Sequence, residues 1–207
     1  MSKHEGILVF SEKHDLMLEM LGKGREIADK LQTSLAAVLM GFNVQEKADE
    51  LIKYGADEVY LVDNQALAHF QIEAYLSVLH NLAVNYKPEI ILIGSTRNGK
   101  PLAARLATRL EAGCVPDCNR LSVDEQRRLV GERITYGGNA AAKITFKAKP
   151  QIATVPARAF EKPEPRDHSG QLVKLDVKIE ESRIEIVETK PLEVSSVRIE
   201  DADVIIS

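Results

Sequence analysis

Four short apolar runs in the first half of the chain predict buried β-strands. Each run is continuous rather than alternating, which is typical of parallel strands that are covered on both faces. The runs occupy residues 6–10, 35–40, 58–62 and 90–93.

Polar and apolar residues between these runs favour helices, most clearly where apolar residues recur at three- and four-residue spacing. The helices are expected within residues 17–31, 45–53, 72–86 and 101–110. Gly55 suits the end of the second helix, Pro88 stops the third, and Pro101 fits the first turn of the fourth. Four strand-then-helix units in succession predict an α/β fold, a Rossmann-like parallel sheet with right-handed crossovers.

The pattern changes from Cys114 onward, because short β-like runs follow one another without a helical stripe between them. These runs lie at residues 121–123, 129–136, 142–146 and 152–155. We expect them to form antiparallel additions at the edge of the sheet.

Residues 161–170 have the composition of a linker, with two prolines, several charges and almost nothing to bury. A boundary there divides the chain into an α/β domain, 1–160, and a linker with a β-rich tail, 161–207. Near-alternating apolar residues in the tail predict strands around a polar hairpin at residues 180–183. Such a ribbon is marginal alone and needs a surface to pack on.

The charge balance argues against general binding to nucleic acid or to an anionic membrane. The chain carries 27 Lys and Arg against 31 Asp and Glu, for a formal net charge of −4. The imbalance lies in residues 161–207, which hold 12 acidic and 7 basic residues, so the tail is acidic and the body is near neutral.

The cysteines and histidines predict neither a metal site nor a catalytic site. Cys114 and Cys118 have C-x-x-x-C spacing, but no second cysteine pair or nearby histidine completes four ligands, so structural thiols are favoured. The start of the chain lacks the apolar run of a secretion signal, and no window approaches a membrane span. With only two cysteines, we expect a cytoplasmic protein.

A glycine-bordered loop after the fourth predicted strand resembles a phosphate-binding loop until its last position. It consists of Gly94, Ser95, Thr96, Arg97, Asn98, Gly99, Lys100 and Pro101. A phosphate loop needs Ser or Thr where Pro101 stands, and proline supplies neither a hydroxyl nor an N–H group. Nucleotide hydrolysis is therefore disfavoured, yet the loop follows a strand end, where ligands or partners of α/β sheets gather. The basic side chains of the loop and the helix after it suit either an anion or acidic partner, or a solvated helix face; they are Arg97, Lys100, Arg105 and Arg109.

A second segment with paired glycines lies between two β-like runs. It consists of Tyr136, Gly137, Gly138, Asn139 and Ala140. Adjacent glycines either make a tight turn or let a foreign backbone approach closely, and a plain turn is favoured by residue chemistry alone.

Several motifs occur together in one order along the chain. They are Tyr-Gly-Ala-Asp-Glu-Val at 54–59, Ala-Leu-Ala-His-Phe at 66–70, Lys-Pro-Glu-Ile-Ile-Leu at 87–92, Gly-Lys-Pro-Leu-Ala-Ala-Arg-Leu-Ala at 99–107 and Gly-Gly-Asn-Ala at 137–140. This collinear series resembles the N-terminal domain of the electron-transfer flavoprotein alpha subunit over residues 6–160. The tail resembles the interdomain region of the same subunit.

The resemblance implies a sheet of the adenine-nucleotide alpha-hydrolase-like class and pairing with a similarly folded beta subunit. It also implies that FAD is held mainly by a separate C-terminal domain, and that the beta subunit binds AMP or a second FAD. In such a complex the flavin carries electrons from an acyl-CoA or other dehydrogenase to an acceptor, while the protein orients and tunes it.

Residues 203–207 resemble the first strand of the FAD domain, and the Gly- and Arg-rich flavin motif that should follow is absent. Either the chain is a truncated subunit or the flavin domain is supplied separately. The family's flavin contacts therefore have no counterpart here. Only the loop 94–99 and the segment 136–139 are nominated, as surfaces that face the beta subunit or the flavin domain.

The leading hypothesis is a docking domain without its own complete catalytic site, which pairs through its sheet edge and β-tail. Alternatively, a free-standing adenine-nucleotide-binding module would use the loop at 94–100. An independent enzyme ranks last, because the sequence offers no acid, base and nucleophile set.

Overall fold

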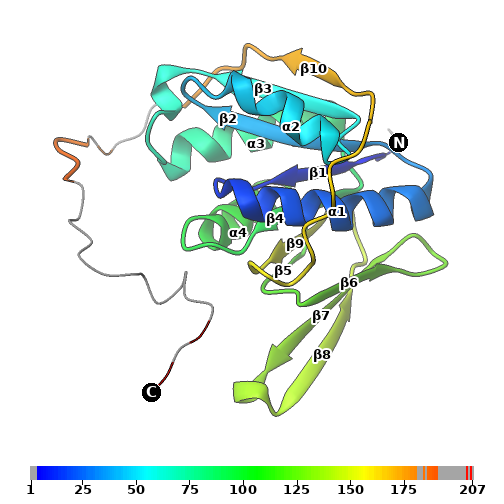
Figure 1. Cartoon of the computed structure of the whole chain (residues 1–207). Helices are drawn as coiled ribbons and strands as arrows, with labels where there is room; N and C mark the ends of the chain where they lie inside the picture. Colours follow the sequence, from blue (N-terminus) through cyan, green and yellow to red (C-terminus); the bar gives the residue numbers. More distant parts are fainter. Residues whose placement is uncertain (1–3, 181–183, 185, 191–203, 205, 207) are drawn as a thin grey trace.

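The computed structural model describes residues 4–180, 184, 186–190, 204 and 206. Within these residues, seven parallel strands form a sheet of order β10-β3-β2-β1-β4-β9-β5. The strands are β1 (Ile7–Phe10), β2 (Leu35–Gly41), β3 (Glu58–Asp63), β4 (Ile90–Gly94), β5 (Cys114–Val115), β9 (Gln151–Val155) and β10 (Gln171–Lys174). The α/β fold with a mostly parallel sheet is therefore confirmed (Figure 1).

Helices cover the sheet in the places that the apolar stripes predict. The α-helices are α1 (His14–Leu31), α2 (Ala48–Lys53), α3 (Ile72–Tyr86) and α4 (Gly99–Arg109). The short 3-10 turns are η1 (Gln45–Lys47), η2 (Gln65–Leu67) and η3 (Tyr136–Gly138). α3 ends where Lys87 adopts a left-handed conformation just before Pro88.

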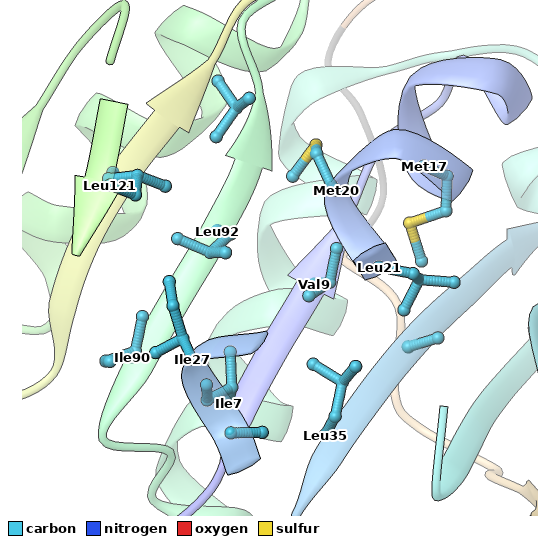
Figure 2. Packing of buried hydrophobic residues seen from close by; sticks show 14 of the residues in the cluster. Ile7, Val9, Met17, Met20, Leu21, Ile27, Leu35, Ile90, Leu92 and Leu121 are labelled. Atoms are coloured by element: carbon cyan, nitrogen blue, oxygen red, sulfur yellow. The ribbon is translucent and has the colours of Figure 1, made fainter. Parts of the chain in front are cut away.

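One face of the sheet is packed by α1. Figure 2 shows side chains of this helix, among them Met20, Leu21 and Ile27, lying against the strand residues Val9, Leu35 and Ile90. Gly24 favours this packing, because a Cβ at this position would lie 2.8 Å from Leu35 Cδ1 and the Leu35 side chain would have to shift. The glycine that weakens the helix by propensity therefore allows it to approach β2 closely. The other face is packed by α3 and α4 around a second cluster of buried side chains.

The antiparallel strands form a small sheet of their own in the described part of the chain. β7 (Leu129–Thr135) pairs on one side with β6 (Arg120–Val123) and on the other with β8 (Ala140–Thr145). Residues 152–155, which we expected among the antiparallel additions, instead form the parallel strand β9 between β4 and β5. No helical stripe precedes this run, which is why it was grouped with the antiparallel strands, and the antiparallel sheet takes the place of a crossover helix between the parallel strands β5 and β9.

The antiparallel sheet is fastened to the main sheet through a buried carboxylate. The Glu89 side chain, 1% exposed, lies at the start of β4 and accepts hydrogen bonds from Arg127 Nη2 at 2.9 Å and Lys149 Nζ at 2.5 Å. Arg127 also donates to the carbonyl of Leu31, at the end of α1, at 2.8 Å. The β6–β7 turn and the segment before β9 are thereby held against the same edge.

Residues 161–170, which have linker composition, lie along α1 and α2. Pro163 packs so closely on α1 that a Cβ at Gly22 would lie 2.8 Å from its Cδ. His168 Nε2 lies 3.1 Å from Asp57 Oδ1, just before β10 joins the edge of the sheet beside β3. The domain boundary in this segment stays a prediction.

Beyond β10 the chain crosses the α3–α4 face as an extended strap, residues 175–180. Its apolar side chains pack on the second cluster, and Glu180 N donates to Ser77 Oγ at 3.0 Å. Arg109 at the end of α4 donates two hydrogen bonds to the Glu180 carboxylate, at 3.2 and 3.0 Å. The polar hairpin expected at 180–183 lies almost entirely outside the described residues.

Candidate functional site

The loop 94–99 lies where the order of strands changes direction. From β1 the chain builds outward through β2 and β3, then returns to the other side of β1 at β4. The crevice outside the carboxyl ends of β1 and β4 is therefore the topological switch point, the usual ligand position in open α/β sheets. The loop follows the carboxyl end of β4, as the sequence predicted.

The loop is folded tightly on itself. Thr96 Oγ1 donates to Glu12 Oε1, in the segment after β1, at 2.5 Å and accepts from Gly99 N at 2.8 Å. A Cβ at Gly99 would lie 1.9 Å from the Gly94 carbonyl oxygen, so only glycine fits at the start of α4. The glycines therefore serve the closure of the loop itself.

A polar network joins the same loop to the segments around β5 and β9. Ser95 Oγ donates to Asp117 Oδ1 at 2.5 Å, and the buried Thr154 hydroxyl donates to Ser95 Oγ at 3.0 Å. Lys100 Nζ donates to Asp117 Oδ2 at 3.0 Å. Burial alone would raise the pKa of Asp117, but the hydrogen bonds from Lys100 and Ser95 and the charge of Lys100 hold that pKa below its ordinary value.

These contacts occupy several of the groups that a phosphate loop would present to a ligand. The Gly99 N–H bonds to Thr96 Oγ1, the Lys100 N–H bonds to the Thr96 carbonyl, and Pro101 has no N–H. The Lys100 ammonium is paired with Asp117. The Gly99 and Lys100 amides and the Lys100 ammonium therefore already have partners within the chain, which disfavours their use for a nucleotide pyrophosphate.

The second nominated segment forms the turn at the tip of the β7–β8 hairpin. Tyr136, Gly137 and Gly138 all have positive φ, at 52°, 64° and 98°. A Cβ at either glycine would have no atom within 4 Å, so space does not select glycine here. The positive φ angles of the turn do. Asn139 Nδ2 closes the turn by donating to the Tyr136 carbonyl at 2.8 Å. This turn and the loop 94–99 belong to different sheets.

Sequence reasoning missed the partners of both the loop and the antiparallel sheet. Asp117 and Thr154 complete the loop network, and Glu89 anchors the small sheet. The one local signal was Glu89, a charged residue directly before the buried apolar run 90–93, where a carboxylate needs a partner. The other contacts join residues at least 17 positions apart, and hydrophobic periodicity gives no information on such pairs.

The two cysteines have the properties of buried structural thiols. Burial raises the pKa of Cys114 to about 11, and burial together with the neighbouring Cys114 raises that of Cys118 to about 12. Cys118 Sγ contacts the Val115 carbonyl at 3.6 Å. A thiol with a raised pKa is a poor nucleophile near neutral pH.

Among the helices of the described residues, none has the length and apolar character needed to cross a membrane.

The fold and site define a Rossmann-like α/β domain in which an antiparallel sheet lies between the fourth helix and a late parallel strand. The model of the electron transfer flavoprotein domain family matches residues 7–180, and the chain belongs to that family. The predicted resemblance is thereby confirmed.

Relatives of known name agree with this assignment. The chain is 37% identical over 219 residues to electron transfer flavoprotein subunit alpha of Thermoanaerobacterium thermosaccharolyticum, covering all of this chain and 66% of the relative. It is 42% identical over 166 residues to the same subunit of Clostridium acetobutylicum, covering 77% of this chain and 49% of the relative. It is 41% identical over 169 residues to the lactate dehydrogenase (NAD(+),ferredoxin) subunit LctC of Acetobacterium woodii, covering 79% of this chain and 40% of the relative. The chain spans less than two thirds of each relative.

Proposed function

We propose that the chain is the N-terminal scaffold and docking domain of an electron-transfer flavoprotein alpha subunit. It pairs with a beta subunit in a FAD-dependent carrier that moves electrons from a dehydrogenase to an acceptor. The observation that carries this proposal is the family match over residues 7–180, together with an alignment that covers the whole chain. The name of the Acetobacterium woodii relative supports a dehydrogenase as the functional neighbour.

The proposal assigns the flavin to a part of the complex outside the described residues of this chain. A dinucleotide needs free donors for its pyrophosphate, and the Gly99 and Lys100 donors of the carboxyl-edge loop are engaged with Thr96 and Asp117. We expect FAD in the portion of the alpha subunit that the relatives have beyond this match. AMP or a second FAD belongs to the beta subunit.

Co-expression with a beta subunit tests the pairing. The purified mixture is analysed by size-exclusion chromatography with light scattering, and a stable one-to-one complex is expected. A chain that stays monomeric beside a folded beta subunit would contradict the proposal. A titration of the chain alone with FAD, followed by flavin fluorescence, should show weak binding or none.

The alternative, a free-standing adenine-nucleotide-binding module, makes the opposite prediction. Calorimetric titration of the chain alone with AMP and ATP would then show tight binding without any partner. The self-contained loop at 94–100 argues against this outcome, because binding would have to displace the Thr96 and Asp117 contacts.

A further inference from the structure

The β6–β8 sheet carries a charge that the rest of the chain lacks. Residues 119–150 contain seven Lys and Arg against three Asp and Glu, so this lobe has a formal charge of +4 in a chain whose total is −4. The remainder is correspondingly acidic. Two of the lobe's cations, Arg127 and Lys149, are committed to the buried Glu89. Of the other five, Arg128 pairs with Asp124 and Arg133 lies on the opposite face of β7, so Arg120, Lys143 and Lys147 are the cations that the outer surface presents.

Strand register places three charged side chains in one row on the outer face. Arg120 lies opposite Glu132, and Glu132 lies opposite Lys143. Residues paired in this way project from the same face of a sheet. Arg120 and Lys143 are 83% and 68% exposed, and their nitrogens lie 3.9 and 3.6 Å from the Glu132 oxygens. One carboxylate shared at these distances leaves the row cationic.

The same face becomes apolar toward the tip of the hairpin. Ile134, two residues beyond Glu132, is 53% exposed and pairs with the exposed Ala141. Tyr136 at the tip is 84% exposed. Branched aliphatic and aromatic side chains this exposed at the end of a narrow hairpin are typical of interaction sites. Figure 1 shows the hairpin projecting away from the main sheet.

The opposite face is used for packing on the body of the domain. A Cβ at Gly131 would lie 2.9 Å from Cys118 Sγ, and Ile144, paired with Gly131, packs on the first core cluster. The hairpin is thus fixed through one face, and the face with Arg120, Lys143 and Ile134 points outward. A two-stranded projection of this kind gains little from its own contacts.

We propose that the outer face of the β6–β8 sheet docks an acidic, partly apolar surface of the beta-type subunit. This face is defined by Arg120, Lys143, Ile134 and the tip residue Tyr136. The inference rests on the proposed function and deepens it by naming the chemistry of the partner surface. Exposed cations steer an acidic partner into place, and the aliphatic and aromatic side chains hold it once water is excluded. The acidic remainder of the chain opposes nucleic acid as an occupant.

The test compares two double variants with a matched control in complexes with the beta subunit, by surface-based kinetics at several salt concentrations. Arg120→Glu with Lys143→Glu should raise Kd at least tenfold at low salt, mainly through slower association. Ile134→Ser with Tyr136→Ala should mainly accelerate dissociation. The control, Lys13→Glu with Lys47→Glu, makes the same charge change at two exposed positions outside the lobe and should leave Kd within twofold. Thermal melting of each variant checks that it folds.

The outcomes separate this inference from the proposed function. If the wild-type pair forms but both hairpin variants bind within twofold of it, the docking face is wrong and the pairing stands. Wild-type affinity that is indifferent to salt would likewise overturn the charged component. If the wild-type chain does not pair at all, both proposals fail together. Tighter binding of a duplex oligonucleotide than of the beta subunit would also overturn the inference.

Discussion

Replacement of Glu89 by Gln should loosen the whole antiparallel sheet. The wild-type carboxylate is almost fully buried and holds Arg127 and Lys149 at hydrogen-bond distance. Removing one member of a buried ion pair costs roughly 3–5 kcal/mol, because charges are left without a partner. Since both cations are partly exposed and can turn toward water, we expect about 3 kcal/mol, at the low end of that range.

Differential scanning calorimetry gives the global effect of this change. For a chain of this size, about 3 kcal/mol corresponds to a Tm lower by roughly 6–12 °C. Hydrogen exchange should locate the change, with amides of β6, β7 and β8 losing protection before those of β1 and β4. The exposed Glu125→Gln, on the same turn as Arg127, is the matched control and should leave Tm nearly unchanged.

The pH dependence supplies the sign of the effect. Burial alone would raise the pKa of Glu89, but the hydrogen bonds and charges of Arg127 and Lys149 hold it below the ordinary 4.5. A carboxyl with a depressed folded-state pKa stabilises the protein above its unfolded value and loses that contribution as the pH falls through the folded value. The difference between wild type and Glu89→Gln should thus be full above about pH 4.5 and shrink below it. A difference below about 1 kcal/mol at pH 7, or one constant from pH 3 to 7, would refute the reasoning.

Three further predictions follow from the packing. Gly99→Ala should lower the free energy of unfolding, measured in urea, by about 3 kcal/mol, because its Cβ would overlap the Gly94 carbonyl. Gly137→Ala lies in open space and should cost only about 1 kcal/mol, for its left-handed backbone. Equal losses would contradict the close approach at Gly99. Arg109→Ala should release the strap at Glu180, so that limited proteolysis beyond β10 becomes severalfold faster while Tm is unchanged; unaltered cleavage would show that the apolar contacts suffice. The two thiols should react with a disulfide reagent at pH 8 more slowly than glutathione does, because burial raises both pKa values, and free-thiol rates would contradict that burial.

The helices and buried strands were predictable because each is recorded locally. The apolar stripe of α3 and the stop at Pro88 coincide with an observed helix of Ile72–Tyr86. The parallel direction of residues 152–155 was not predicted. Their continuous apolar run fits a parallel strand, but no helical stripe precedes it to indicate a crossover. β5, with only Cys114 and Val115, is too short to produce any periodicity.

For the nominated site residues too, position was predictable from local sequence but contacts were not. The position of loop 94–99 followed from the strand before it, and the turn at 136–139 followed from its glycines. What these segments contact depends on Asp117, Thr154 and Glu12, which come from other parts of the chain. Sequence reasoning could place the loop but could not show that Ser95, Thr96 and Lys100 already have partners within the chain.

The contrast between the two segments bears on the kind of protein this is. At the carboxyl edge, where a ligand-binding α/β domain presents donors, Ser95, Thr96 and Lys100 bond to the chain itself. At the hairpin, Ile134 and Tyr136 are left exposed beside a cationic row. A small-ligand site instead needs a concave pocket in which a few polar groups are free to contact the ligand. This contrast supports the proposal that the chain docks on another protein.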